Sequence, residues 1–282
     1  MIISVASGKG GTGKTTVAVN LALSIQNVQF LDCDVEEPNA HIFLNPEIKE
    51  QEKAYIPVPL IDEKKCIYCG RCRQVCAYNA FAVLPAKENR KGSILVFTNL
   101  CHGCGACSFF CPQKAITEVN KEIGIVEKGV CRGIEFIHGK LNVGEAMAPP
   151  LIRQVKKYIN PEKTVIIDVP PGTSCPVVSS LRRSDFCLLV TEPTPFGLND
   201  LILAVEVVRK LKIPFGVLIN RSDLGDKATE TYCEKEKIPV LMQIPFKKEI
   251  AQSYSQGISI VEKFPEYKNS FLTMFQKILR TK

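Results

Sequence analysis

The chain has 282 residues, of which 45% are hydrophobic, and its formal net charge is +7. That is enough apolar material for one large core and a smaller second unit. No apolar run approaches the ~20 residues that span a bilayer, and the first residues lack a signal-peptide pattern, so we expect a soluble cytoplasmic protein.

The first predicted elements are an apolar strand over residues 1–6, a glycine-rich loop and a helix over residues 17–23. The loop fits G-x-x-x-x-G-K-[ST] from Gly8 to Thr15, in which backbone N–H groups surround a phosphate chain. Lys14 is expected to reach the outer phosphates, and Thr15 to bind Mg²⁺. The predicted nucleotide-binding residues of this segment are Gly8, Lys9, Gly10, Gly11, Thr12, Gly13, Lys14, Thr15 and Thr16.

A buried strand is predicted over residues 28–34, and it ends in Asp32 and Asp34. Acidic side chains at the carboxyl end of a strand beside a phosphate loop lie where Mg²⁺ and the attacking water are held. Helix capping or turn formation is the alternative role of these two residues.

Thirteen cysteines are too many for ordinary core packing, and in a cytosolic protein close-spaced cysteines indicate metal. Two runs have the bacterial ferredoxin spacing C-x₂-C-x₂-C-x₃-C. Each cysteine of the second run follows its counterpart by 35 residues (Cys66 to Cys101), which indicates an internal duplication.

In this spacing, three cysteines of one loop reach one [4Fe-4S] cluster, and the fourth points toward the other cluster. The predicted ligands of the first cluster are Cys66, Cys69, Cys72 and Cys111, and those of the second are Cys101, Cys104, Cys107 and Cys76. Zinc is disfavoured, because four-coordinate zinc usually takes paired C-x₂-C knuckles. Two such clusters would lower the charge of +7 to roughly +3, so we expect no nucleic-acid partner.

Strands alternate with helices in the rest of the chain. Apolar strands are predicted over residues 164–168, 186–191, 214–221 and 240–245, with helices over 151–159, 198–211 and 228–237. The first of these strands ends in Asp168, which can orient the waters around Mg²⁺. The fold class is therefore α/β, a mostly parallel doubly wound P-loop NTPase sheet with an inserted α+β ferredoxin-like domain. We expect the insert at residues 59–119, between the two ATPase parts 1–58 and 120–282.

These motifs together resemble the MinD/ParA superfamily of P-loop ATPases. Lys9 resembles the second, signature lysine of that family, the segment of Asp32 and Asp34 its switch I, and residues 167–172 its Walker B and switch II segment. Asn220 and Pro245 match its adenine-contacting ends. The nitrogenase iron protein and Mrp-type iron–sulfur carriers are similar at a greater distance.

The resemblance implies an ATP-dependent homodimer in which Lys9 reaches the nucleotide of the partner subunit. Lys14 and Thr15 would bind phosphate and Mg²⁺, Asp34 would position the attacking water, and Asp168 would hold the Mg²⁺ shell. Lys247 and Lys248 depart from the family, whose members often have an acid there, so adenine is favoured over guanine without being fixed.

Two further segments have more than one interpretation. Cys175 follows the predicted switch II, and we interpret it, like Cys33, Cys131, Cys187 and Cys233, as a small buried residue rather than a redox or dimer-bridging cysteine. The apolar residues of 271–279, with Lys277, Arg280 and Lys282, fit either an amphipathic membrane-binding helix or a last helix packed on the sheet. We prefer the packed helix.

Three functions remain. The leading hypothesis is an ATPase whose dimer rearrangement gates electron transfer through two [4Fe-4S] clusters to a redox partner protein. The second is an iron–sulfur assembly or carrier ATPase that delivers clusters to an acceptor protein, and the third is a MinD-like localisation switch with structural clusters.

Overall fold

The computed structural model describes residues 1–88 and 90–281. Asn89 of the expected insert and Lys282 of the expected C-terminal helix lie outside this description. The chain divides into two compact units, one of residues 1–52, 126–140 and 152–282, the other of residues 53–125 and 141–151. The second unit extends beyond the expected 59–119, because the long strands β3 (Glu47–Ile61) and β6 (Ile116–Cys131) run through the boundary.

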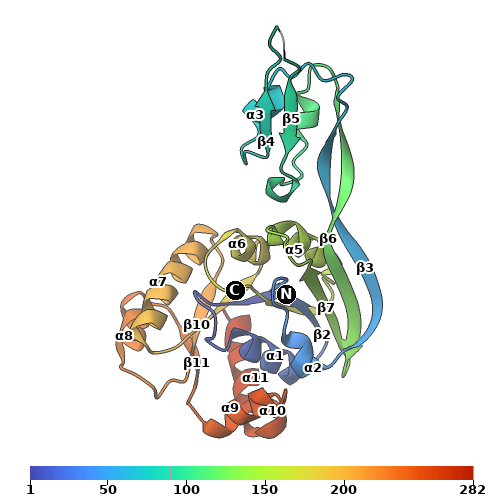
Figure 1. Ribbon diagram of the computed structural model, residues 1–282. Helices are drawn as coiled ribbons and strands as arrows, with labels where there is room; N and C mark the ends of the chain where they lie inside the picture. Colours follow the sequence, from blue (N-terminus) through green and yellow to red (C-terminus); the bar gives the residue numbers. More distant parts are fainter. Residues whose placement is uncertain (89, 282) are drawn as a thin grey trace. The chain divides into compact units, whose positions relative to one another are not determined.

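A mostly parallel sheet forms the first unit (Figure 1). Its strand order is β11-β10-β9-β1-β8-β2-β7, and β7 is followed by β6 and β3. The bounds are β1 Ile2–Ala6, β2 Val28–Asp32, β7 Ile134–Leu141, β8 Thr164–Asp168, β9 Phe186–Thr191, β10 Phe215–Asn220 and β11 Val240–Ile244. β1, β2, β8 and β9 are almost wholly buried, as expected of strands covered by helices on both faces.

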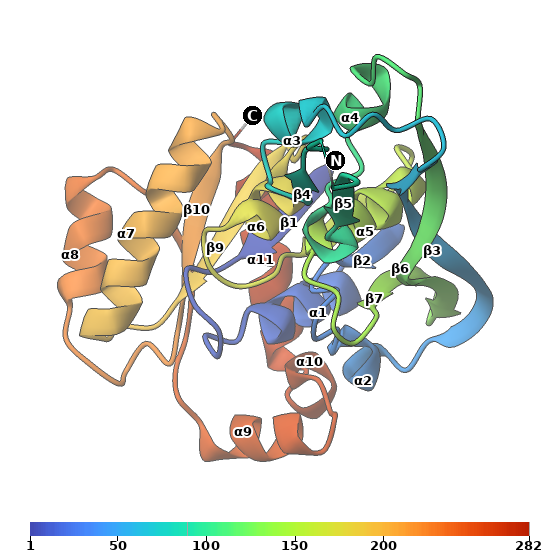
Figure 2. The ribbon, with the colours of Figure 1, turned by 45° about the horizontal axis from the view of Figure 1, so that its top comes forward.

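Helices cover both faces of this sheet (Figure 1). On one face α1 and α11 lie side by side, next to α2, α9 and α10 (Figure 2). On the other face lie α5, α6, α7 and α8 (Figure 1). The bounds are α1 Lys14–Ser24, α2 Ala40–Leu44, α5 Ala148–Val155, η2 Lys156–Tyr158, α6 Cys175–Leu181, α7 Pro195–Lys210, α8 Ala228–Lys235, α9 Lys248–Ser255, α10 Ile260–Lys263 and α11 Glu266–Leu279.

The apolar face of α11 belongs to the core. Phe271, Met274 and Ile278 are buried in the same cluster as Val17 and Leu21 of α1. This burial is the packed-helix arrangement, because it leaves those side chains no surface for a lipid. No helix among residues 1–88 and 90–281 is long and apolar enough to cross a membrane.

Two glycines of the loop after β1 are required, one by a close backbone approach and the other by its positive φ beside a side chain. A Cβ on Gly8 would lie 2.1 Å from the carbonyl oxygen of Asp200 in α7. Gly13, which precedes α1, has φ +87°, and a Cβ there would lie 2.5 Å from Nδ2 of Asn220. The loop thus touches the helix after β9 and the end of β10, so both fix its course.

The second unit repeats its local backbone with the 35-residue offset of the cysteines (Cys66 to Cys101). Gly70 and Gly105, which precede the short helices, have φ values of +76° and +73°. Asn79 and Lys114 have φ values of +54° and +48°. The elements are α3 Arg71–Val75, β4 Phe81–Leu84, β5 Ser93–Val96, η1 Thr98–Leu100 and α4 Ala106–Phe109, and α3 packs against α4.

Candidate functional site: a phosphate-loop pocket and two cysteine cavities

Two buried carboxylates lie side by side where the central strands end. Asp32 of β2 and Asp168 of β8 are register partners on neighbouring parallel strands, and Val5 of β1 pairs with Asp168 on its other side. The loop that follows β1 therefore passes directly over both carboxylates. This is the crevice at the carboxyl ends of the strands, where open α/β sheets bind ligands.

Lys14 lies against two of the predicted carboxylates. Its Nζ is 2.8 Å from Oδ1 of Asp168 and 3.7 Å from Oδ2 of Asp34. Burial by itself lowers the pKa of Lys14, but the attraction of Asp168 and Asp34 outweighs it and raises that pKa above its ordinary value. Lys14 is therefore a fixed positive charge at the floor of the loop.

Asp32 shapes the segment that follows β2. Its Oδ1 accepts a hydrogen bond from the backbone N–H of Asp34, and its Oδ2 accepts one from that of Ala40, the first residue of α2. The capping and turn role that the sequence left open is thus present. Burial and the nearby Asp168 carboxylate raise the pKa of Asp32 to about 8, and burial is also the main reason that the pKa of Asp34 rises to about 6.

The donor set suits a divalent cation with a phosphate chain. Asp168 Oδ2 and Thr12 Oγ1 are buried and have no hydrogen-bond partner among the described residues. Three carboxylates face a single lysine here, so added positive charge would relieve the excess of negative charge. Mg²⁺ in proteins is usually bound by one or two carboxylates together with substrate phosphates and water. The carboxylates at the floor of the pocket can supply these protein ligands.

A pocket opens above this floor. The predicted residues that line it are Lys9, Gly10, Gly11, Gly13, Lys14, Thr15, Thr16, Asp34, Asn220 and Pro245. Gly8, Thr12, Asp32 and Asp168 lie beneath or beside the lining. Asn220 fixes the far wall, because its Nδ2 donates a hydrogen bond to the carbonyl oxygen of Thr12, 2.9 Å away.

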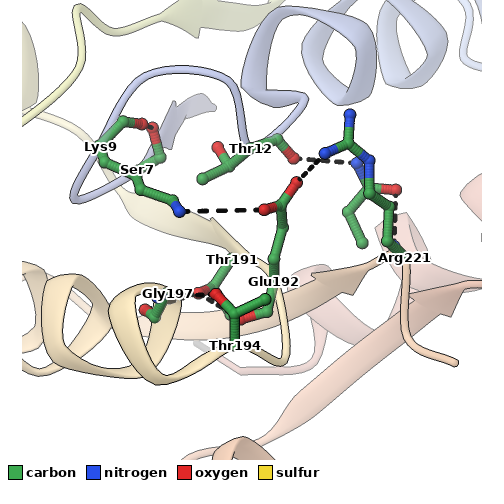
Figure 3. A network of polar contacts seen from close by, with 9 residues as sticks. Ser7, Lys9, Thr12, Thr191, Glu192, Thr194, Gly197 and Arg221 are labelled. Atoms are coloured by element: carbon green, nitrogen blue, oxygen red, sulfur yellow. Dashed lines mark hydrogen bonds and ion pairs between the residues drawn. The ribbon is translucent and has the colours of Figure 1, made fainter. Parts of the chain in front are cut away.

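Figure 3 shows Glu192 between two cations of the pocket. Its carboxylate lies 2.6 Å from Nη1 of Arg221 and 3.9 Å from Nζ of Lys9. Lys9 thus lies against its own subunit in this structure. Glu192 was not among the predicted site residues, although it directly follows β9, and the ends of strands beside a phosphate loop are where functional acids occur.

The eight predicted cluster ligands line two separate cavities of the second unit. One is lined by Cys66, Cys69, Cys72 and Cys111, and we call it cavity one. The other is lined by Cys76, Cys101, Cys104 and Cys107, and we call it cavity two. The fourth cysteine of each run thus lies in the cavity of the other run.

The fourth sulfur of each cysteine run accepts the same kind of backbone hydrogen bond. The backbone N–H of Ala80 donates to Cys76 Sγ and that of Ala115 to Cys111 Sγ, each at 3.3 Å. Burial raises the pKa of the Cys72 and Cys101 thiols, and that of Cys107 to about 11. Buried thiolates therefore need a nearby positive charge, such as iron.

No three or more His, Cys, Asp or Glu side chains in residues 1–88 and 90–281 converge as a site for one metal ion. The cysteines are instead spread around the two cavities, four to each. Such a distribution suits a polynuclear group whose separate iron atoms each take one thiolate.

Cys175 corrects one expectation. The sequence favoured a buried side chain, but Cys175 is exposed, because it is the first residue of α6 on the surface after the Pro-Pro-Gly segment. Cys33, Cys131, Cys187 and Cys233 are buried, as expected of structural cysteines.

The chain matches the model of the CobQ/CobB/MinD/ParA nucleotide-binding domain over residues 3–260. An uncharacterized protein of Methanocaldococcus jannaschii is 35% identical, over 93% of this chain and 92% of its own. An iron–sulfur cluster carrier protein of Pyrococcus abyssi is 24% identical, over 92% and 78%. Among solved structures, the septum site-determining protein MinD with Mg-ADP from Pyrococcus horikoshii has a TM-score of 0.61 at 19% identity, covering 98% and 95%.

The raised pKa of Asp32 gives the nucleotide-free protein a pH-dependent stability. Unfolded Asp32 ionises near 3.8, whereas the folded protein keeps that proton up to about 8. The folded state therefore binds more protons in this window, so the free energy of unfolding falls as the pH rises through it. In urea titrations, Asp32→Asn is expected to flatten this fall.

Asp226→Asn, at an exposed position, is the matched control and should keep the slope of the wild type. Parallel stability curves for Asp32→Asn and the wild type would show that Asp32 is ionised in the folded protein, against this account.

Proposed function

The chain belongs to the CobQ/CobB/MinD/ParA nucleotide-binding family, and from this premise we propose that it is an ATPase coupled to electron transfer. ATP-driven rearrangement of a homodimer would gate the passage of electrons through two [4Fe-4S] clusters to a partner protein. The observation that carries the proposal is the sorting of eight cysteines into two cavities, in a chain that also has a P-loop pocket.

Four residues would act on the triphosphate. The side chain of Lys14 would move from Asp168 to bind the outer phosphates, and the backbone N–H groups of the loop would bind the rest of the triphosphate. Thr15 and Asp168 would hold Mg²⁺, which neutralises the developing charge on the phosphate oxygens when bound. Asp34 lies at the pocket wall, 3.7 Å from Lys14, where it would orient the attacking water.

Lys9 is proposed to act across a dimer. Its side chain is only about a third exposed, and its present partner at 3.9 Å is Glu192. A contact this long between partly solvated groups is weak, so the phosphates of a partner's nucleotide would compete well for Lys9. Asn220 and Pro245 line the pocket where the family resemblance implies the adenine.

A cluster-carrier function is the second candidate, because relatives named iron–sulfur cluster carrier proteins are 23–26% identical to this chain. Against it, every iron of both clusters would have its own cysteine, and Cys72, Cys101 and Cys107 are buried. Cargo is released more readily from few, exposed ligands. Incubation with an apo-acceptor separates the two functions, because a carrier loses its iron to the acceptor and an electron carrier keeps it.

Substitution of the two lysines tests the ATPase proposal. Lys14→Ala should lower the ATPase rate by about 100-fold or more, since it removes the main charge on the transferred phosphate. Lys9→Ala should keep nucleotide binding in the monomer but lose hydrolysis and the ATP-dependent dimer, measured by light scattering.

The exposed Lys210→Ala is the control and should behave as the wild type. An unchanged ATPase rate in Lys14→Ala would contradict the proposed ATPase activity. A Lys9→Ala variant that still dimerises and hydrolyses ATP would show that Lys9 does not act on the partner's nucleotide.

Iron content tests the cluster assignment. Anaerobic reconstitution should load about eight irons per chain. Cys111→Ala and Cys76→Ala should each lower this to about four, because each removes one ligand from a different cavity. In Cys111→Ala, the remaining cluster should be the one that depends on Cys101, Cys104 and Cys107.

Cys175→Ala, which changes an exposed cysteine of the other unit, should retain the full iron content. The assignment fails if neither substitution reduces the iron, or if the wild type takes up zinc in place of iron.

A further inference from the structure

The two cavities differ sharply in the charges around them. Residues 62–76, which hold the first cysteine run, carry four cations, Lys64, Lys65, Arg71 and Arg73, and Lys114 follows the lining residue Gln113. The two acids of this segment, Asp62 and Glu63, pair with Lys65 and Lys91. In contrast, the chain from Gly92 to Gln113 contains no Asp, Glu, Lys or Arg at all. Among the described residues, the only Asp, Glu, Lys or Arg that lines cavity two is Glu118.

The cations beside cavity one are available to a partner. Lys64, Arg71, Arg73 and Lys114, which we call the basic rim, are all exposed. Within residues 1–88 and 90–281 no carboxylate forms an ion pair with any of these four, whereas Lys65 pairs with Asp62 at 3.4 Å. The guanidinium of Arg71 lies 5.8 Å from the centre of the Phe110 ring, which holds it beside the cavity that it lines.

The negative charge of a cluster does not by itself explain the basic rim. Cavity two has the same number of cysteines and the same hydrogen bond to its fourth sulfur, yet its lining, as far as the structure describes it, contains no Lys or Arg. Its neighbourhood is apolar instead, with Phe109 83% exposed. The rim is therefore a feature of one cavity only, which indicates a role toward something outside the protein.

We propose that the basic rim is the docking surface of an acidic electron-carrier protein, which exchanges one electron at cavity one. This inference rests on the proposed electron-transfer function. The exchange is a single-electron step in which the reduced carrier is oxidised and the cluster of cavity one is reduced, or the reverse. No bond forms or breaks, and no proton moves.

Physical reasons favour an acidic protein as the occupant. Electron-transfer encounters are small and weak, and complementary charge supplies their rate and orientation. Cys69 of cavity one is exposed, so a carrier that rests on the basic rim comes close to a cluster ligand. A nucleic acid or an anionic membrane would gain nothing from being placed at that cysteine.

The test compares two triple charge reversals on the reconstituted full-length protein. Lys64→Glu/Arg73→Glu/Lys114→Glu removes three cations of the basic rim and leaves Arg71, which lines the cavity. Lys210→Glu/Lys227→Glu/Lys268→Glu makes the same change of net charge at exposed positions of the other unit. The probe is an acidic flavodoxin, and binding is measured by fluorescence anisotropy together with electron exchange by stopped-flow absorbance.

We expect the rim variant to weaken flavodoxin binding and slow electron exchange by about tenfold or more. The control variant should stay within about twofold of the wild type. Salt should weaken the wild-type complex and have little effect on the rim variant. Dithionite, which needs no docking, should reduce all three proteins equally, and their iron contents should match.

Several results would overturn the inference. Equal losses in the two triple variants would show that only net charge matters, and no loss in either would remove the docking surface. Binding of the wild type to anionic vesicles or to DNA, lost in the rim variant while flavodoxin does not bind, would assign the rim to that other occupant. A wild type that holds no reducible cluster would instead refute the proposed function itself.

Discussion

The buried ion pair between Lys14 and Asp168 determines the layout of the nucleotide pocket. At 2.8 Å it joins the start of α1 to the end of β8, so the loop after β1 is held over the central strands. A buried charge is tolerated only when it is well paired, and here one lysine faces Asp168, Asp34 and, more distantly, Asp32. The site consequently carries an excess of negative charge that a bound cation would offset. Burial and the neighbouring Asp168 carboxylate raise the pKa of Asp32, whereas burial is the main cause of the raised pKa of Asp34.

Much of the nucleotide unit follows from its sequence, because the relevant signals are local. The apolar strands, the glycine-rich loop and the acids at the strand ends each carry their own pattern, and the order of the elements leads to a parallel sheet. Glu192 and the exposure of Cys175 were not foreseen. Both depend on which strands are neighbours and on where a helix begins, and these are properties of the whole fold rather than of a short segment.

The grouping of the eight cysteines into two sets of four was predictable for a different reason, because the two cysteine runs are an internal duplication. Repetition of one spacing implies repetition of one backbone, and the matching φ values of Gly70 and Gly105 are the structural form of that repeat. The exchange of the fourth cysteine between cavities follows from the same symmetry. The charges that surround the cavities do not obey the repeat, however. No sequence pattern marks the basic rim. It becomes evident only when the charges around cavity one are compared with those around cavity two.

The proposed function requires that nucleotide state and redox state are linked in one chain. The most direct measurement is a redox titration of the reconstituted protein by electron paramagnetic resonance, with ADP, with a non-hydrolysable ATP analogue, and with no nucleotide. We expect the analogue to shift the potential of at least one cluster by roughly 30 mV or more, about a threefold change in a one-electron equilibrium, and Lys9→Ala to abolish the shift. Identical potentials in all three nucleotide states would contradict it.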